Sequence, residues 1–294
     1  MNEELEVLKL ADYSELFEED GASAYLIINS KIKDHPCLFG FVNLTENFET
    51  AKKLFDRMEQ RARDMGYHEI IGPINYCTWL SYRFALDRFD MKLFPDCNNP
   101  RYYVDFVKKL GFDEFLTYRS ANVKIHNPLF EIGKKSFEEK QKEGFVFKHY
   151  EGEEAFDKVK EIYDISCDAF KNALLYSELP FEYFERIYLA WVKKVTVQLF
   201  VAYKNGQAIG FVMGYKNPFA DNFISKSSAV KTEYQKQQVF AALLYYGSSY
   251  VEKMGFDSMI YHFQCEQKAD FKRFDAEYES DEKRYALFRK ELDQ

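Results

Sequence analysis

A run of polar and aromatic side chains stands directly after a predicted strand, in the segment GPINYCTWLSYRF (residues 72–84). Gly72 and Pro73 end that strand. Five side chains that could contact a ligand follow: Asn75, Tyr76, Trp79, Tyr82 and Arg83. Because ligands of α/β proteins bind at the carboxyl ends of parallel strands, an aromatic pocket with one arginine suits an acidic or amphipathic acceptor. The same aromatic side chains could instead pack an interface between two halves of the chain, and both interpretations stay open here.

The composition argues against several classes of protein. The chain has 294 residues and a net charge of −8, whereas nucleic-acid binders carry basic faces, so we expect no nucleic acid as a partner. The five cysteines are scattered, and neither they nor the five histidines have the spacing of a disulfide framework or a metal site. The N-terminus lacks an apolar signal core, and the longest apolar run, 239–246, is far shorter than the roughly 20 residues that span a bilayer. We therefore expect a reduced cytoplasmic protein without a membrane partner or a metal.

Hydrophobic periodicity predicts strands that alternate with helices, in two halves. Predicted strands lie at 24–29, 37–43, 69–74, 145–149, 196–203, 208–215, 223–230 and 258–263. Predicted helices lie at 51–65 and 101–110, at two places between 156 and 195, and at 235–254. We place the first half at 1–126, a linker at 127–144 and the second half at 145–294.

The two halves also share a sequence pattern. The segment ARDMGYHEIIGPIN (62–75) aligns with VEKMGFDSMIYHFQ (251–264), each spanning the end of a helix and the strand after it. A short helix beginning Arg-Tyr is predicted after each of these units, at Arg101 and at Arg284. The shared order favours duplication of one strand–helix–strand unit over coincidence.

The segment AVKTEYQKQQVFAALL (229–244) resembles the acetyl-CoA motif A-V-x-x-x-Y-R-G-x-G-x-G-x-A-L-L of the GNAT N-acetyltransferase superfamily. The resemblance extends in element order over about 145–292, and residues 37–125 resemble a related group of GNAT-like proteins. It implies an α/β fold of two GNAT-like domains, with mixed sheets and helices on both faces. It also implies that a strand splays from its neighbour near residue 230 and that acetyl-CoA or another acyl-CoA binds there. The implied cofactor-binding residues are Ala229, Val230, Gln235, Lys236, Gln237, Gln238, Val239 and Phe240.

The sequence departs from the motif where the phosphates would bind. Lys236, Gln238 and Phe240 replace its three glycines, which normally permit positive φ and a close approach of the backbone to a ligand. Either the cofactor binds with altered geometry or this half no longer binds it. In the first half, 43–50 occupies the place of the glycine loop, and the first strand and paired helices of the family are missing, so that half is the less suitable cofactor site.

The resemblance also directs attention to a general acid and a general base. A tyrosine in the closing helix of many family members protonates the departing thiolate, but the aligned residue here is Phe288. Tyr285, one helical turn earlier, is a substitute acid. His262 and Glu266 lie where a base would be placed, although a hydrogen-bonded core histidine and an ordinary surface carboxylate are the alternatives.

These observations favour an acyl-CoA-dependent N-acyltransferase that acts on a small-molecule or peptide amine. Two alternatives remain. The first is a non-catalytic protein that kept the fold for binding and lost the phosphate loop. The second is an aminoacyl-tRNA-dependent transferase, which the acidic charge disfavours. A homodimer also stays open.

Overall fold

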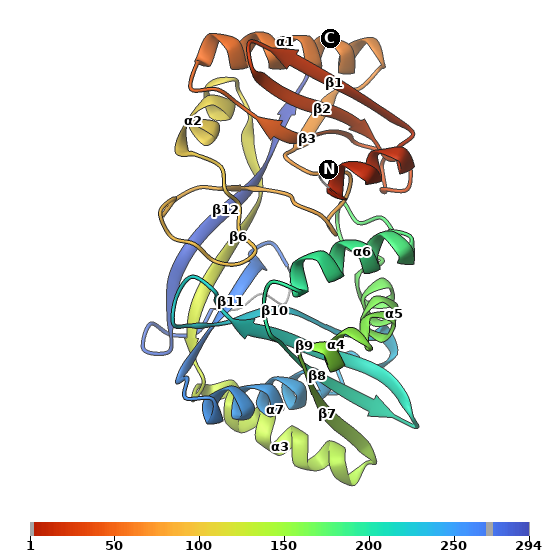
Figure 1. Ribbon diagram of the computed structural model, residues 1–294, viewed down its shortest axis with the longest axis vertical. Coiled ribbons are helices and arrows are strands. Elements are labelled where there is room, and N and C mark those ends of the chain that lie inside the picture. Colours follow the sequence, from red (N-terminus) through yellow and green to blue (C-terminus); the bar gives the residue numbers. More distant parts are fainter. Residues whose placement is uncertain (1–2, 269–272, 294) are drawn as a thin grey trace.

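The computed structural model describes residues 3–268 and 273–293. Its strands form one continuous mixed sheet in the order β1-β2-β3-β4-β12-β6-β11-β10-β9-β8-β7, and β5 pairs with β12 at the side. The first half occupies one end of an elongated molecule and the second half the other (Figure 1). The predicted α/β class is confirmed, with the two expected sheets joined into one.

The first half contains one 3-10 helix, two α-helices and six strands. They are η1 (Glu3–Leu10), β1 (Tyr13–Glu19), β2 (Ala22–Ile28), β3 (Cys37–Asn43), α1 (Phe48–Asp64), β4 (Glu69–Gly72), β5 (Phe84–Ala85), α2 (Arg101–Lys109) and β6 (Asp113–Lys124). Asn47 caps α1, because its side chain accepts hydrogen bonds from the amides of Glu49 and Thr50.

The second half begins with a helix and ends with a long strand. Its elements are α3 (Pro128–Lys142), β7 (Phe145–Glu151), α4 (Glu153–Phe156), α5 (Val159–Phe170), α6 (Phe181–Val192), β8 (Val197–Lys204), β9 (Gln207–Lys216), β10 (Phe223–Val230), η2 (Thr232–Tyr234), α7 (Val239–Lys253), β11 (Ser258–Cys265) and β12 (Glu279–Glu291). None of the helices in the described part of the chain has the length and apolar character needed to cross a membrane.

The proposed linker at 127–144 contains α3. Asn127 caps this helix by accepting a hydrogen bond from the amide of Leu129, and Pro128 stands in its first turn, where a missing amide hydrogen costs nothing. The helix packs along α7, and a Cβ added to Gly133 would lie 2.7 Å from the carbonyl oxygen of Ala241. Glycine at this position therefore permits the close approach of the two helices.

The two halves exchange their last strands. β12, from the second half, lies between β4 and β6 of the first half and is antiparallel to both. In turn, β6 of the first half lies between β11 and β12 of the second half. The buried guanidinium of Arg119 in β6 reinforces the contact by forming ion pairs with Glu279 and Asp281 of β12. Each half therefore completes its sheet with a strand from the other.

The helix predicted to begin at Arg284 is wrong, because this segment belongs to β12. Residues 285–288 (Tyr-Ala-Leu-Phe) are all fully buried. A continuous buried run is typical of a strand in the middle of a sheet that is covered on both faces. An amphipathic helix would have turned some of these side chains to solvent. Tyr285 thus lies on a strand and does not stand one helical turn before Phe288.

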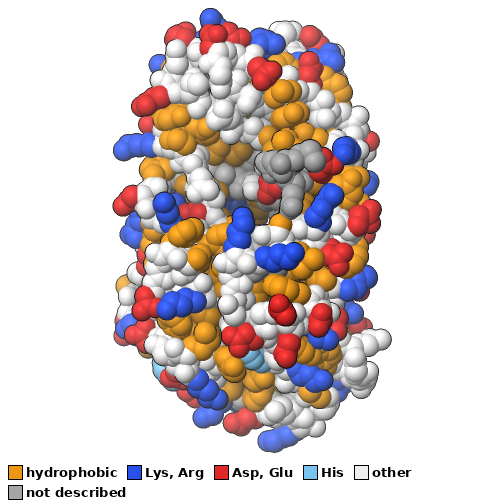
Figure 2. All heavy atoms as spheres, viewed as in Figure 1, with side chains coloured by type: hydrophobic (Ala, Val, Ile, Leu, Met, Phe, Trp, Pro, Cys, Tyr) orange, Lys and Arg blue, Asp and Glu red, His pale blue; other side chains and the backbone are white. Residues whose placement is uncertain are grey.

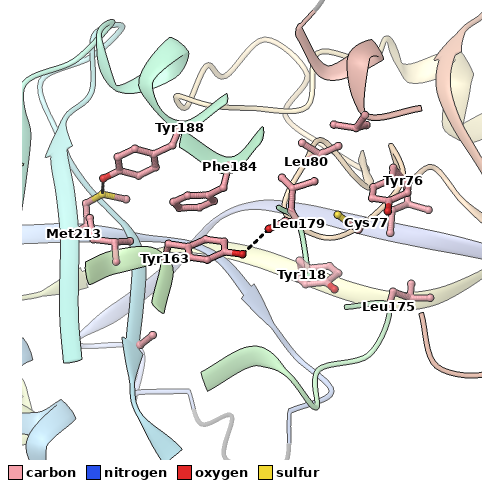
Figure 3. Close-up of a cluster of buried hydrophobic side chains, with 14 of the residues drawn as sticks. Tyr76, Cys77, Leu80, Tyr118, Tyr163, Leu175, Leu179, Phe184, Tyr188 and Met213 are labelled. Atoms are coloured by element: carbon pink, nitrogen blue, oxygen red, sulfur yellow. Dashed lines mark hydrogen bonds between the residues drawn. The ribbon is translucent and has the colours of Figure 1, made fainter. Parts of the chain in front are cut away.

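Alternation along the strands places cores on both faces of the sheet, as predicted. In β8, Leu199 and Val201 belong to a core with the helices α5 and α6, whereas Phe200 and Ala202 pack with α7. The core on the α5 side continues into the first half, where Cys77 and Leu80 of the 73–83 loop and Tyr118 of β6 join it (Figure 3). One hydrophobic cluster therefore fastens the halves together.

Candidate functional site

The sheet opens where β10 meets β11. These parallel strands are paired only at Ile224 with Ile260 and at Ser225 with Tyr261. β10 then continues to Val230 and β11 to Cys265 without further pairing between them. One edge of β10 is therefore free of a neighbouring strand, which agrees with the splay that the resemblance implies.

Both strands are irregular at the point where they separate. The register of β10 against β9 shifts between Ser225 and Ser227, which leaves Lys226 as an extra residue. The register of β11 against β6 shifts between Tyr261 and Gln264, and Phe263 there has a φ of 59°. Since β-bulges redirect side chains, these irregularities explain how Lys226 and Phe263 come to line the cleft.

The corresponding opening in the first half is closed. β3 and β4 share only two residue pairs, but the amide of Ile74 then donates to the carbonyl of Phe39 over 2.8 Å. The side chain of Asn75 accepts from the amide of Phe41 at 2.7 Å and donates to Glu4 of η1 at 2.8 Å. Asn75 thus bridges the two strands from within, and only the second half keeps an open gap.

The loop before α7 has backbone conformations that glycine favours, although it contains no glycine. Lys236 and Gln238 have φ values of 65° and 60°, in the left-handed region that glycine favours. Gln238 is the N-cap of α7, yet its side chain makes no capping hydrogen bond and instead accepts from the hydroxyl of Ser136 in α3 at 2.8 Å. The first amides of α7 therefore lack a side-chain cap, and an anion could take that place.

The other predicted cofactor residues have mainly structural surroundings. Ala229, Val230 and Val239 are buried in the cores, whereas Phe240 is 44% exposed. The side chain of Gln235 donates to the carbonyl of Val230 at 3.1 Å, and that of Gln237 donates to the backbone carbonyl of Glu233 at 2.7 Å. These contacts fix the path of the loop from β10 to α7.

Asp168 of α5 holds the same loop from the side. Its carboxylate accepts a hydrogen bond of 2.5 Å from the amide of Thr232. Hydrogen bonds from Lys171 and then from Thr232 lower the pKa of Asp168 to about 2. The carboxylate therefore stays charged, and the loop stays attached to α5, over the physiological pH range.

A cleft of about 2280 Å³ lies between the two halves and reaches the gap between β10 and β11. Its walls include the 73–83 loop from the first half and parts of β10, β11, α6 and α7 from the second. Figure 2 shows one face of the molecule hollowed between the halves, with hydrophobic side chains around the hollow and Lys and Arg side chains nearby. Both halves therefore form the walls of this candidate site.

The sequence-predicted loop residues divide between the interface and the cleft. Tyr76 is completely buried in the cluster between the halves. The indole of Trp79 donates to the carbonyl of Ser177 at 2.9 Å, and its ring lies 5.2 Å from that of Phe184. Trp79 also touches the cleft, together with Tyr82 and Arg83.

Arg83 lies in an aromatic cage. Its guanidinium carbon is 3.6, 4.2 and 3.9 Å from the ring centroids of Tyr82, Tyr118 and Phe263. The residue is only 6% exposed, and its Nη1 has no hydrogen-bond partner among the residues that the structure describes. Its φ of 77° is unfavourable for a non-glycine residue, and such conformations occur at ligand sites.

Lys226 is a second cation in this wall. Its Nζ is 5.5 Å from the ring centroid of Phe263, and the side chain is half-buried. Burial, and then the nearby charge of Arg83, lower the pKa of Lys226 to about 8. The buried carboxylate of Asp96 forms its ion pair with Lys283, at 2.8 Å.

His262 is the one predicted catalytic residue that lines the cleft in the described part of the chain. Its Nε2 donates to the carbonyl of Pro95 and its Nδ1 is bonded to the hydroxyl of Ser120, both at 2.7 Å. Burial, followed by the charge of Lys226, lowers its pKa well below the usual histidine range. His262 is thus a neutral imidazole with both nitrogens engaged, which agrees with the core-histidine interpretation.

Tyr285 and Glu266 lie elsewhere. Tyr285 is completely buried, 3.3 Å from the hydroxyl of Ser120, and burial raises its pKa. Glu266 forms an ion pair of 2.7 Å with Arg273. Neither is among the described residues that line the cleft.

The sequence interpretation missed Lys226, Tyr118 and Phe263. The signal for Lys226 is a single charge within the strand FISKSSAV, which otherwise consists of small and apolar residues. Tyr118 and Phe263 carry no comparable signal, because only tertiary packing brings them to Arg83. No three His, Cys, Asp or Glu side chains of the described residues come together as metal ligands.

Comparisons with known proteins address the fold. Residues 159–271 match the acetyltransferase (GNAT) family, and no curated protein sequence matches the chain. A conserved protein of Enterococcus faecalis V583 is similar in structure, with a TM-score of 0.56 and 10% identity over 92% of this chain and 59% of that one. A tandem GNAT protein from the clavulanic acid biosynthesis pathway has a TM-score of 0.50 and 9% identity over 100% of this chain and 89% of its own.

A third similar structure is a GCN5-related N-acetyltransferase from Sphaerobacter thermophilus, with a TM-score of 0.50 and 10% identity over 93% of this chain and 81% of that one. Identities this low establish a shared fold and nothing about substrates. The chain therefore has the tandem GNAT fold, and residues 159–271 within its C-terminal half match the acetyltransferase (GNAT) family.

Proposed function

We propose that the chain is an acyl-CoA-dependent N-acyltransferase whose second half binds the cofactor. The observation that supports this best is the separation of β10 from β11 beside the uncapped first turn of α7. The first half is an unsuitable cofactor site, because Asn75 bridges its strands at the equivalent place. The acyl-CoA is acetyl-CoA or a homologue, and the acceptor amine enters through the cleft between the halves.

In this proposal each part of the cofactor meets a group suited to it. The pyrophosphate lies at the first amides of α7, where the positive end of the helix dipole favours an anion. The pantetheine amides pair with the free edge of β10. A backbone amide of β10 near Val230 polarises the thioester carbonyl.

The reaction balances without a dedicated acid. The amine nitrogen forms a bond to the thioester carbon, the C–S bond breaks, and the proton lost by the amine ends on the thiolate of CoA. Since a thiolate is a good leaving group, the burial of Tyr285 does not prevent transfer. We assign no role in the reaction to Tyr285 or Glu266. His262 lines the cleft as a neutral imidazole.

Gln238→Glu tests the cofactor site. In wild type, acetyl-CoA at about 100 times its dissociation constant should add about 2.7 kcal/mol to the free energy of unfolding, read as a rise in melting temperature. The variant should lose this rise, since its carboxylate repels the pyrophosphate. A carboxylate at a helix N-terminus stabilises the helix itself, so misfolding is not expected.

Gln207→Glu provides the matched control. It makes the same chemical change at an exposed residue, at the start of β9. This variant should keep the full response to acetyl-CoA. A Gln238→Glu protein that responds like wild type would refute cofactor binding at α7.

A non-catalytic binding protein is the second candidate. The side chains at the glycine positions, together with the engaged nitrogens of His262, favour it. Release of free CoA thiol in the presence of a panel of amines distinguishes the two. Amine-dependent thiol release supports the transferase, whereas acetyl-CoA binding without turnover for any amine supports the binding protein.

A further inference from the structure

Arg83 and Lys226 form a pair of cations without a resident anion. Neither has an ion pair with any residue that the structure describes, and Nη1 of Arg83 lacks a hydrogen bond. The carboxylates around them already form ion pairs with other cations: Asp96 with Lys283, Glu266 with Arg273 and Asp281 with Arg119. Burying an unpaired guanidinium N–H costs free energy unless a ligand satisfies it.

The cage dictates how a ligand can reach Arg83. Three ring faces surround the guanidinium carbon at 3.6–4.2 Å. Nε already donates to the carbonyl of Tyr82 at 3.1 Å, so the remaining donors lie at the far edge of the group. A planar acceptor with two oxygens matches that edge, and a carboxylate has this shape.

The backbone holds this arrangement at a cost. Both Arg83 and Phe263 have positive φ, and the amide of Arg83 donates to the carbonyl of Pro73 at 2.9 Å, which helps to fix it. Bulky residues adopt this conformation only where the surroundings impose it, and such strain is concentrated at ligand sites.

The anion that belongs here is not the pyrophosphate of the cofactor. Lys226 precedes Val230 by four residues of the extended strand β10. At roughly 3.3 Å per residue, about 13 Å of strand separates it from the loop that leads to α7. The cation pair therefore lies at the opposite end of the open strand edge from the proposed phosphate site.

We propose that Arg83 and Lys226 bind a carboxylate of the acceptor, so that the acceptor is an amine that also carries a carboxylate, as an amino acid does. That the bound molecule is the acceptor rests on the proposed function, whereas the carboxylate site itself does not. Arg83 forms the bidentate contact at its free edge, and Lys226 adds a second positive charge from β10. The aromatic rings exclude water from the pair and so strengthen it.

Acetate, titrated into the full chain without CoA and at constant ionic strength, probes the site. The readout is the side-chain NMR signal of Arg83 in arginine-labelled protein, assigned by its loss in Arg83→Gln, or in Arg83→Lys if the first variant does not fold. We expect a saturable shift with acetate and none with neutral acetamide. Lys226→Gln should weaken acetate binding roughly tenfold, because it removes one of two charges.

Arg186 is the matched control, since it also lies over a ring, that of Tyr183 at 5.0 Å, but is exposed on α6. Its signal should not saturate with acetate. The proposal is overturned if acetamide acts like acetate, if Arg83 does not respond, or if inorganic phosphate binds and acetate does not. It is also overturned if Arg83→Gln removes the stabilisation by acetyl-CoA, which would place Arg83 in the cofactor site. Failure of acetyl-CoA to bind would refute the proposed function and leave the acetate result standing.

Discussion

Expressed alone, residues 1–126 are expected to be unfolded or aggregated. β12 forms hydrogen bonds to both β4 and β6, and it contributes Ala286 and Phe288 to the core beneath α1 and α2. Without it, β4 and β6 are exposed edges on either side of an empty place in the sheet. The free energy of unfolding of a small domain, about 5–15 kcal/mol, is too small to withstand the loss of a central strand.

Circular dichroism and size-exclusion chromatography of the two half-chains test this expectation. Residues 127–294 alone should also be defective, because β11 and β12 both lose their shared neighbour β6. Co-expression of the two pieces should restore a one-to-one complex with the spectrum of the whole chain. Two half-chains that each fold as stable monomers would show that strand exchange does not couple the halves.

Lys283→Met is expected to reduce the free energy of unfolding by about 3–5 kcal/mol. Lys283 and Asp96 are 1% and 5% exposed and form an ion pair of 2.8 Å between β12 and the 95–99 loop. Lys283 also donates to the carbonyl of Met91 at 2.9 Å. Removing the cation leaves a buried carboxylate without its partner, which is far more costly than the pair itself is favourable.

Urea denaturation of single and double variants separates the two contributions. Adding Asp96→Asn to Lys283→Met should recover part of the lost stability, since the buried charge is then gone. Asp96 accepts hydrogen bonds from the amide of Leu93 at Oδ2 and from the amide of Cys97 at Oδ1. The single carbonyl oxygen of asparagine can accept only one of them, which is why the recovery should be partial. If the double variant is less stable than Lys283→Met alone, the carboxylate was not the destabilising group.

Much of the fold followed from periodicity, because many elements carry their own local signal. The helix around Leu54, Phe55 and Met58 and the strands at 196–203 and 208–215 were predicted close to their observed places. β12 was mistaken for a helix because its Arg-Tyr pair at Arg284 was matched to the start of the helix at Arg101. Only its place between β4 and β6 explains its continuous buried run. The exchange of strands is a long-range pairing that no local pattern encodes.

The candidate site was predictable only in part. Arg83 stood out as a charge among aromatic residues after a strand, and its observed place in the cleft agrees with that interpretation. Tyr76 and Asn75 had the same local signal but are used within the fold, one in the core and one as a bridge. Lys226 and Phe263 depend on strand irregularities, which arise from how neighbouring strands pair and not from the residues themselves.

Isothermal titration calorimetry with acetyl-CoA tests most directly whether one half is open and the other closed. We predict one equivalent bound per wild-type chain, and none in Gln238→Glu, because β10 is free beside α7 and Asn75 closes the first half. Two equivalents per chain, or no binding at any concentration, would contradict this assignment.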